Sequence, residues 1–218
     1  MNTPELRFPA GLYGITPEWD DTDRLLEAVR AAARGGMRAV QLRRKTVSLP
    51  YKHLQARDVG DLCRSLGVAF ILNDHWRLAL ECGADGVHLG RDDGDLAAVR
   101  ASAGPGLLIG ASCYDEIDRA RLALQAGADY IAFGAVYPSP TKPQAVRAPL
   151  ALLGQGRRLA EAMPAPRPAV VAIGGITPDN AAPVVEAGAD AIALVTGLFE
   201  APDVEAAARR CAALYPQT

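Results

Sequence analysis

Short apolar runs alternate along the whole chain with longer segments in which Ala, Leu and Arg recur at helical spacing. The apolar runs are brief and almost uninterrupted, which is typical of parallel strands covered on both faces. We predict strands over residues 12–16, 39–43, 69–73, 86–89, 107–111, 130–133, 169–173 and 191–195. We predict helices over residues 21–34, 51–65, 75–81, 95–103, 115–126, 150–162, 178–187 and 204–214. This alternation favours an α/β fold, a (β/α)8 TIM barrel, as a single domain over residues 1–218 with a core at about 12–208.

A short motif recurs before every second predicted strand. Gly-Ala-Asp begins at Gly83, Gly127 and Gly188, and a related Gly-Met-Arg begins at Gly36. Each glycine follows a predicted helix, where glycine readily adopts the left-handed conformation of a helix cap. The intervals between these glycines are 47, 44 and 61 residues, and such unequal spacing favours a closed barrel over a solenoid. An open doubly wound sheet also alternates strands with helices and stays the alternative fold.

Composition narrows the functional classes. The 218 residues include 23 Lys or Arg and 25 Asp or Glu, which gives a net charge of −2. This balance argues against a dedicated nucleic-acid binder. No apolar run approaches the ~18 residues of a transmembrane helix, so we expect no membrane partner. Four scattered cysteines without a C-x-x-C pair indicate reduced thiols in a cytoplasmic protein rather than disulfides or a zinc site.

In such a barrel the chemistry lies at the C-terminal ends of the strands. The second predicted strand ends in Gln41, Arg43 and Lys45, and alternate residues of a strand share one face. A guanidinium and an ammonium beside a neutral amide suit a polyanion. The alternative for these residues is a solvated basic loop.

The loop after the sixth predicted strand is long and polar, and three prolines stiffen it. Its donors are Ser139, Thr141 and Lys142. These features are typical of a binding loop or lid, with a plain surface loop as the alternative. Ser112, at the end of the fifth predicted strand, is placed to donate a hydrogen bond to a phosphate.

Acidic residues follow two neighbouring predicted strands. Asp74 comes directly after the third strand, where it is either a helix N-cap or a ligand. Asp92 and Asp93 follow the fourth strand, so one of them with Asp74 would offer two carboxylates on adjacent strand ends. Hard oxygen ligands without a His or Cys cluster suit Mg²⁺ held partly by phosphate oxygens. His88 lies within the fourth strand, and we leave open whether it is a core histidine or a substrate contact.

The seventh predicted strand runs into a Gly-Gly pair that ends at Gly175, and the eighth runs into Thr196 and Gly197. Loops at these two positions commonly build a phosphate site from backbone N–H groups. Thr177 followed by Pro178 is typical of a helix N-cap and first helical residue, so we expect the helix to begin there.

The strand ends therefore contain two different anion sites. A backbone site after the seventh and eighth strands fits a monophosphate. Arg43, Lys45 and Lys142, with Mg²⁺ on Asp74 and Asp93, fit a diphosphate. A barrel with both sites suggests joining or exchange between two phosphorylated small molecules.

In its motifs the chain resembles the thiamine phosphate synthase family from about residue 12 to residue 208. The motifs are Gln41-x-Arg43-x-Lys45, Asn73-Asp74, Gly86-Val87-His88-Leu89-Gly90 followed by Asp93, Gly110-Ala111-Ser112, Pro138-Ser139-Pro140-Thr141-Lys142 and Gly174-Gly175-Ile176-Thr177. The resemblance implies a Mg²⁺-dependent transferase. It would join 4-amino-5-hydroxymethyl-2-methylpyrimidine diphosphate to 4-methyl-5-(2-phosphoethyl)thiazole, giving thiamine phosphate and diphosphate. The family is thought to react dissociatively, with diphosphate leaving before the thiazole nitrogen attacks.

The resemblance also implies roles for individual residues. The diphosphate would be held by Arg43, Lys45, Asn73, Ser112 and Lys142. One Mg²⁺ per subunit would be bound by Asp74 and Asp93. The pyrimidine pocket would be lined by Tyr13, Gln41 and His88. The thiazole phosphate would be bound by the backbone of Gly175, Val195 and Thr196, with help from Ser139 and Thr141.

Two departures and three alternatives accompany this assignment. Arg44 and Arg91 stand where many relatives carry Glu and Gln, which adds positive charge near the mouth of the barrel. A thiazole tautomerase is the nearest alternative, but it would need neither the metal carboxylates nor the diphosphate cations. A sugar-phosphate epimerase and a non-catalytic sensor of thiamine phosphate are the others. The sequence leaves open whether Asp92 shares the metal and whether the chain forms a homo-oligomer.

Overall fold

The structure, a computed structural model, describes residues 5–139 and 144–216. Eight parallel strands follow one another in chain order and close into a barrel, with the last strand paired to the first. The strands are β1 (Gly11–Ile15), β2 (Met37–Leu42), β3 (Ala69–Asn73), β4 (Gly86–Leu89), β5 (Leu108–Tyr114), β6 (Tyr130–Phe133), β7 (Ala169–Ile173) and β8 (Ala191–Leu194). The predicted barrel is confirmed, and the open sheet is wrong.

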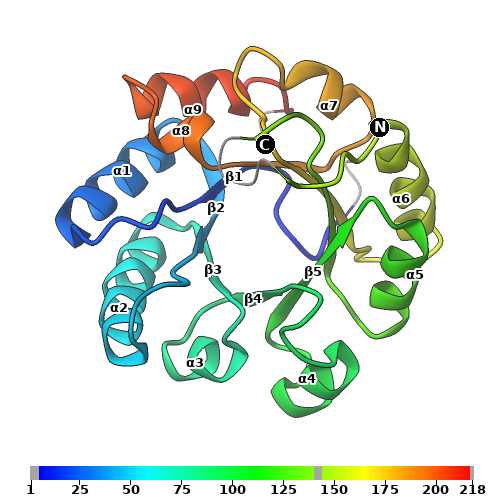
Figure 1. The fold of residues 1–218 in the computed structure, drawn as a ribbon, viewed down its shortest axis with the longest axis horizontal. Coiled ribbons are helices and arrows are strands. Elements are labelled where there is room, and N and C mark those ends of the chain that lie inside the picture. Colours follow the sequence, from blue (N-terminus) through cyan, green and yellow to red (C-terminus); the bar gives the residue numbers. More distant parts are fainter. Residues whose placement is uncertain (1–4, 140–143, 217–218) are drawn as a thin grey trace.

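Helices surround the ring of strands, as the view down the barrel shows (Figure 1). They are α1 (Thr22–Arg34), α2 (Leu49–Leu66), α3 (Trp76–Glu81), α4 (Leu96–Ala103), α5 (Ile117–Gln125), α6 (Ala151–Glu161), α7 (Ala182–Glu186), α8 (Thr196–Phe199) and α9 (Val204–Ala212). None of those in the described residues is long and apolar enough to cross a membrane.

The helices that follow β7 and β8 differ from the prediction. We expected a helix from Pro178, but α7 begins at Ala182. Asn180 is the reason, because its side chain closes a turn in which Oδ1 accepts from the Thr177 amide at 2.8 Å. The single turn of α8, directly after β8, was not predicted.

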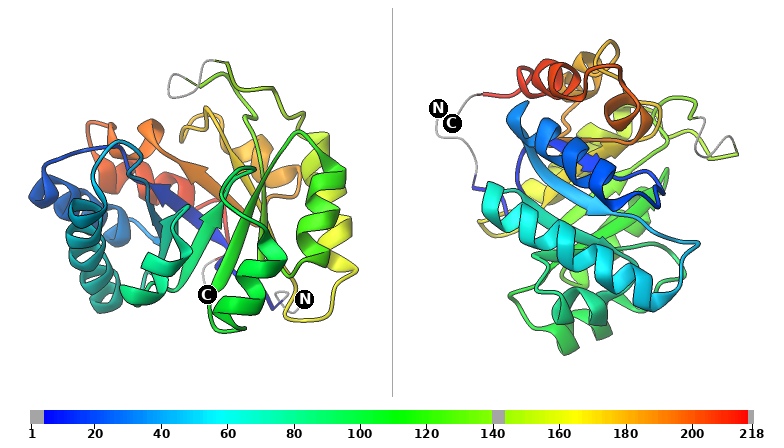
Figure 2. Two further views of the ribbon diagram at one scale, coloured as in Figure 1. Left: turned by 60° about the horizontal axis from the view of Figure 1, so that its bottom comes forward. Right: turned by 90° about the vertical axis from the view of Figure 1, so that its left-hand side faces the viewer.

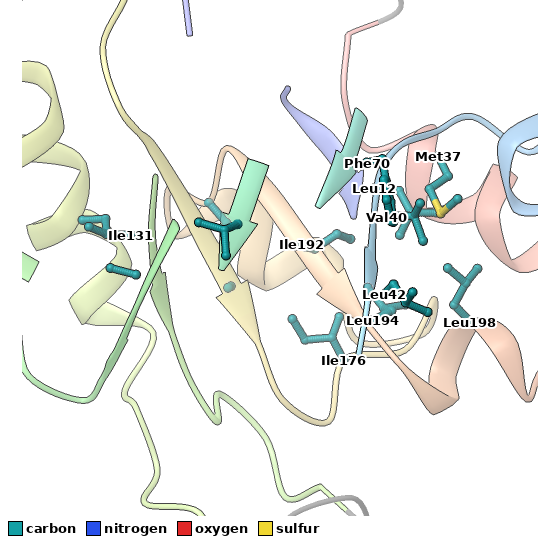
Figure 3. Packing of buried hydrophobic residues seen from close by; sticks show 14 of the residues in the cluster. Leu12, Met37, Val40, Leu42, Phe70, Ile131, Ile176, Ile192, Leu194 and Leu198 are labelled. Carbon is teal, nitrogen blue, oxygen red and sulfur yellow. The ribbon is translucent and has the colours of Figure 1, made fainter. Parts of the chain in front are cut away.

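The barrel has two apolar layers, which explains why the strand sequences are almost continuously apolar. On β1, the side chain of Leu12 belongs to the layer between strands and helices, whereas Tyr13 belongs to the barrel interior. The outer layer includes Val40 of β2 and Ile192 of β8, which Figure 3 shows beside Leu12 and Leu42. Alternate residues of each strand therefore enter different cores, and both cores consist mainly of apolar side chains.

The N-terminal end of the barrel is closed by residues that precede β1. Leu6 forms a parallel bridge with Arg167, and this brings Phe8 beneath the strands. Phe8 is fully buried, with ring centroids 5.0 Å from Tyr13 and 4.3 Å from Tyr130. Among the described residues, these aromatic rings fill the closed end, and a large cavity opens at the opposite end.

The recurring Gly-Ala-Asp motif has a structural role at this closed end. Its aspartates each accept a hydrogen bond from the backbone amide of the second residue of the preceding strand. Asp85 accepts from Phe70, Asp129 from Ile109 and Asp190 from Val170, at 2.7–2.8 Å. The motif glycines all have positive φ, as the helix-cap interpretation predicted. The repeat thus links β3 to β4, β5 to β6 and β7 to β8 at the bottom of the barrel.

Candidate active site

A cavity of about 1250 Å³ opens at the C-terminal ends of the strands. Its lining includes every predicted site residue that the structure describes: Tyr13, Gln41, Arg43, Lys45, Asn73, Asp74, His88, Asp93, Ser112, Ser139, Gly175, Val195 and Thr196. Thr141 and Lys142, also predicted to take part, lie outside the described residues. Residues from all eight strand ends therefore meet in one chamber, as the barrel topology requires.

Arg43 and Lys45 lie on the same side of this cavity, and Glu18, from the loop after β1, holds their loop in place. The Glu18 carboxylate accepts from Arg43 Nη1 at 3.0 Å and from the Lys45 amide at 3.2 Å. It also accepts from the amide and the hydroxyl of Thr46. Burial alone would raise the pKa of Glu18, but these hydrogen bonds and the Arg43 charge lower it below its ordinary value. Glu18 was not predicted, because the sequence around a loop acid does not indicate which residue it will pair with.

Asp74 and Asp93 bring two carboxylates together beside Lys45. Burial raises the pKa of Asp74, and a hydrogen bond with Asp93 and the Asp93 charge raise it further. Lys45 Nζ lies 3.3 Å from Asp74 Oδ2 and opposes that shift. Asp93 Oδ2 accepts from the Gly90 amide at 2.7 Å. Asp74 does not cap α3, because the residue at the cap is His75.

Behind this carboxylate pair lies a second contact that the sequence analysis missed. Lys52, a buried residue of α2, donates from Nζ to Nε2 of His75 at 2.6 Å. Burial lowers the pKa of Lys52, although the charges of Asp74 and Glu18 oppose the shift. Burial and the Lys52 charge lower the pKa of His75 as well. A lysine at the start of a helix usually reaches solvent, so nothing in the pattern indicated this burial.

Five side chains form a continuous line of hydrogen bonds across the barrel interior, which we call the relay: Gln41, Tyr13, Tyr130, His88 and Ser112. Gln41 Nε2 donates to the Tyr13 hydroxyl at 2.6 Å, and the hydroxyls of Tyr13 and Tyr130 are 3.0 Å apart. His88 Nδ1 lies 3.0 Å from the Tyr130 hydroxyl, and His88 Nε2 lies 2.8 Å from Ser112 Oγ. His88 is thus both bonded to the core and exposed to the cavity.

Tyr130 is the member of the relay that the sequence analysis missed. It is fully buried at the first position of β6, where an aromatic residue is typical of a strand core. Its ring occupies the space that a side chain at Gly110 would need, since a Cβ there would collide with the ring. The sequence did contain one indication of this contact, namely a glycine on one strand and a large polar aromatic residue on the next.

The opposite side of the cavity is built from backbone. Gly175 has φ of 65°, and a Cβ at this position would collide with the Pro138 carbonyl of the loop after β6. Gly197 packs equally closely, with its Cβ position 2.5 Å from the Ile176 carbonyl. The first amides of α8, beginning at Thr196, have no partner within the helix. Three loops therefore meet at an edge that offers backbone N–H donors.

The loop after β6 folds over this edge. Two of its backbone segments pair, with the Ala135 amide donating to Val146 at 3.1 Å and the Ala148 amide donating to Ala135 at 2.9 Å. Arg147 donates to the Val136 carbonyl, and the Tyr137 hydroxyl donates to the Asn180 carbonyl at 3.2 Å. Figure 2 shows the loop projecting beyond the C-terminal ends of the strands, consistent with the predicted lid.

The two arginines that depart from the common family pattern are held by acids. Arg44 turns away from the cavity, is buried, and pairs with Asp20 at 2.5 Å. Arg91 pairs with Glu116 at the rim of the cavity. Neither change removes a residue to which the sequence analysis assigned chemistry.

Comparisons with known proteins agree on one family. A family described as thiamine monophosphate synthase matches residues 12–198. A thiamine-phosphate synthase of Bordetella avium is 68% identical over all 218 residues and over its own full length. One of Bordetella pertussis is 66% identical over 96% of this chain and 97% of its own. The solved structure of a thiamine phosphate pyrophosphorylase from Pyrococcus furiosus has a TM-score of 0.79 and 32% identity, covering 94% of this chain and 95% of that one.

Proposed function

The chain belongs to the thiamine monophosphate synthase family and is an enzyme of thiamine biosynthesis, and on that premise we propose that the cavity at the C-terminal ends of its strands holds both phosphorylated substrates at two separate anion sites. One observation carries the proposal. Side-chain cations and facing carboxylates line one side of the chamber, whereas close-packed glycines and helix amides line the other. The tautomerase, epimerase and sensor alternatives leave the first of these sides unexplained.

We assign the diphosphate of the pyrimidine substrate to the charged side. Arg43 and Lys45 supply a guanidinium fork and an ammonium, and Asn73 and Ser112 line the same chamber with an amide and a hydroxyl. Lys142 remains part of this proposal on its sequence alone. Glu18 pairs with Arg43 at 3.0 Å and so orients the guanidinium at the cavity rim.

Asp74 and Asp93 fit a divalent cation. Burial raises the pKa of Asp74, and the hydrogen bond with Asp93 and the Asp93 charge raise it further, because two neighbouring carboxylates repel each other once both are ionised. Within the described residues no group of three or more His, Cys, Asp or Glu side chains gathers at one point. Two hard oxygen donors with the remaining positions left to water and phosphate are the coordination that Mg²⁺ favours. Bound there, Mg²⁺ would neutralise charge on the diphosphate oxygens.

We assign the pyrimidine ring to the floor formed by Tyr13, Gln41 and His88. Burial raises the pKa of the Tyr13 phenol well above its ordinary value, so this side chain stays neutral. Tyr13 and Gln41 therefore offer hydrogen bonds without charge to a heterocycle with an amino group. Below it Phe8 and Tyr130 fill the barrel, so water cannot approach the ring from that side.

We assign the thiazole phosphate to the backbone side, at Gly175, Val195 and Thr196. The Thr196 amide opens α8, and helix N-termini favour anions. Ser139 lines the same chamber, and Thr141 stays a sequence-based assignment. Backbone N–H donors of this kind suit a monophosphate.

The proposed reaction uses these two sides together. The bond between the pyrimidine methylene carbon and the diphosphate oxygen breaks, and its electron pair leaves with the diphosphate. The lone pair of the thiazole nitrogen then forms the new carbon–nitrogen bond. Arg43 and Lys45 stabilise the negative charge that builds on the leaving oxygen, and they act most strongly at that moment. The backbone site holds the thiazole so that its nitrogen faces the methylene carbon.

Incubation of the purified protein with both substrates tests this proposal. With Mg²⁺ we expect thiamine phosphate and diphosphate in equal amounts, measured by mass spectrometry and a diphosphate assay. Omission of either substrate should abolish both products. EDTA should abolish turnover, and added Mg²⁺ should restore it. Undiminished turnover in EDTA would contradict the role of Asp74 and Asp93, and diphosphate release without thiazole phosphate would contradict a joining reaction.

Two broader expectations, the location in the cell and the oligomeric state, are still predictions. A cytoplasmic location rests on the four cysteines, which are free thiols in the structure. We leave open whether the chain forms a homo-oligomer, and sedimentation of the purified chain would answer this question.

A further inference from the structure

The relay contains five hydrogen-bonding groups in sequence, and each group has few protons to give. An amide NH₂ can only donate, a phenol or a serine hydroxyl carries one proton, and a neutral imidazole carries one N–H. The direction of the first hydrogen bond therefore fixes the direction of the following ones. Burial raises the pKa of both Tyr13 and Tyr130 well above the ordinary value, so both phenols keep their proton.

The direction is set at Gln41. Its Nε2 donates to the Tyr13 hydroxyl at 2.6 Å, and Nε2 has no lone pair with which to accept in return. The proton of Tyr13 is therefore directed to the Tyr130 hydroxyl, 3.0 Å away. Tyr130, which accepts that bond, must direct its own proton to Nδ1 of His88 at 3.0 Å.

The consequence appears at the cavity. With Nδ1 as the acceptor, neutral His88 carries its proton on Nε2 and donates it to Ser112 Oγ at 2.8 Å. Ser112 accepts that bond, so its own hydroxyl proton is left for a further partner. Ser112 lines the cavity on the side that we assign to the diphosphate.

We propose that Tyr130 is a positioning residue, and that the relay it completes holds His88 as the Nε2–H tautomer and so reserves the Ser112 hydroxyl proton for an anion. The Ser112 part of this inference rests on the proposed function, whereas the tautomer does not. In the opposite polarity His88 would accept from Ser112, and the hydroxyl would have only lone pairs to present to a diphosphate.

The barrel is built to keep Tyr130 in this place. Gly110 leaves the space that the Tyr130 ring occupies, and Phe8 packs against the ring from below. The His88 ring stacks on it at 25° with a centroid distance of 5.5 Å. Rotation of Tyr130 out of the relay would require movement of β5, β6 or the closed end of the barrel.

Nitrogen-15 spectra of the histidine rings test the polarity in the ligand-free protein. The chain has three histidines, so substitution of each one assigns its signals. At mildly alkaline pH, where an ordinary imidazole is neutral, we expect His88 to be protonated at Nε2. Gln41→Glu should reverse the relay, because a carboxylate can only accept, and should move the proton to Nδ1.

Tyr130→Phe keeps the ring but removes the link. In the double variant Gln41→Glu, Tyr130→Phe, the substitution at Gln41 should no longer move the His88 proton. Tyr51→Phe is the control, because it removes a hydroxyl that donates to the Asp20 carbonyl outside the relay. It should leave the His88 tautomer and its response to Gln41→Glu unchanged. An Nδ1–H tautomer in the wild-type protein, or the same response with and without the Tyr130 hydroxyl, would overturn the inference.

A double-mutant cycle tests the link to the anion. With inorganic diphosphate and Mg²⁺ as the probe, Ser112→Ala and Tyr130→Phe should each weaken binding about fivefold, the scale of one hydrogen bond. Together they should weaken it no more than Ser112→Ala alone. Independent effects would overturn the action of Tyr130 through Ser112. If Ser112→Ala binds diphosphate normally while His88 remains the Nε2–H tautomer, the diphosphate site of the proposed function is wrong, not the polarity.

Discussion

Aspartates lie at both ends of the barrel, but their surroundings are opposite. At the closed N-terminal end, Asp190 accepts two hydrogen bonds from Arg167 at 2.8–2.9 Å and one from Arg157 at 2.7 Å. Its side chain is 5% exposed, and a strand amide occupies a further position on its oxygens. At the open end, Asp74 and Asp93 face each other, with Lys45 as the nearby ammonium.

Aspartates at the closed end therefore stabilise the fold, whereas those at the open end are suited to binding a ligand. A carboxylate whose oxygens are fully occupied by donors cannot bind anything further, and it contributes by holding strands in register. Two carboxylates placed together repel, and that repulsion falls when a cation binds between them. In a barrel of parallel strands, the first arrangement lies where strands begin and the second where they end.

The largest effect should come from breaking the closed end. Asp190→Ala would leave the buried Arg167 guanidinium without its carboxylate, so we expect a loss of about 3–5 kcal/mol in the free energy of unfolding. Urea denaturation at neutral pH measures this loss. The specific activity of the molecules that remain folded should change little, because Asp190 lies far from the cavity lining.

Asp179 offers a matched control. Its carboxylate pairs with Arg210 at 2.5 Å, but the two side chains are 80% and 58% exposed. Asp179→Ala should leave the urea midpoint unchanged, because exposed ion pairs contribute little. Equal losses in both variants would mean that burial does not distinguish the closed end.

The next effect should come from the open end and should appear in rate rather than in stability. Asp74→Asn or Asp93→Asn should lower Mg²⁺-dependent turnover by at least ~10²-fold, the scale of losing a preorganised electrostatic group. The amide oxygen at position 93 can still accept from the Gly90 amide, so the loop should keep its shape. Steady-state kinetics with both substrates, together with circular dichroism, separate the two readouts.

Asp92→Asn provides the comparison at the same end. Asp92 is exposed and lines the same cavity beside Asp93, so this variant removes an equal charge from the neighbouring position. A loss of less than threefold would restrict the metal to Asp74 and Asp93. A loss as large as that of Asp93→Asn would add Asp92 to the site.

A smaller effect should come from the backbone side of the cavity. Gly175 and Gly67 both have φ of 65°, but a Cβ at Gly175 would collide with the Pro138 carbonyl, whereas nothing lies within 4 Å of one at Gly67. We expect Gly175→Ala to raise the KM for the thiazole phosphate about tenfold through displacement of the loop after β6. Gly67→Ala carries the same backbone strain, about 1–2 kcal/mol, and should leave both KM values unchanged. Equal rises in both KM values with Gly175→Ala would contradict the separation of the two anion sites.

The strands and most of the cavity lining could be predicted because both depend on local rules. A strand covered on two faces must be apolar throughout, and a residue at its C-terminal end must face the mouth of the barrel. Gln41, Asp74 and His88 were found in this way. The helix predicted from Pro178 was wrong because the Asn180 side chain supplies a turn that a proline at the first helical position does not reveal.

What sequence reasoning missed depends on contacts between distant segments. Glu18 accepts a hydrogen bond from Arg43, which is 25 residues away, and the Tyr130 hydroxyl bonds to that of Tyr13, which is 117 residues away. Each residue has an ordinary local explanation, a loop acid and a core aromatic residue. Lys52 likewise lies near the start of a predicted helix, where a lysine usually reaches solvent. The side chains that line the cavity were therefore predictable, but the residues that contact and orient them were not.

The smallest effect concerns how the stability of the protein depends on pH through Asp74 at the open end. Burial, the hydrogen bond to Asp93 and the Asp93 charge together raise the pKa of Asp74 in the folded protein. The folded state therefore binds this proton more tightly than the unfolded chain, and stability falls as pH rises through the folded pKa. Asp74→Asn removes this penalty. Without divalent metal, we expect the variant to gain stability relative to wild type as pH rises from about 3.9, the unfolded pKa, to neutrality.

Thermal unfolding in EDTA across that pH range measures the gain as a small upward shift in Tm of Asp74→Asn. Added Mg²⁺ should raise the Tm of the wild type but not that of the variant, because only the paired carboxylates bind the ion in the folded state. Asp190→Asn should behave in the opposite way, with a loss of stability at neutral pH that Mg²⁺ does not restore. A wild-type Tm that exceeds that of Asp74→Asn at neutral pH in EDTA would mean that Lys45 already neutralises the pair. The acids of the open end would then differ from those of the closed end in exposure alone.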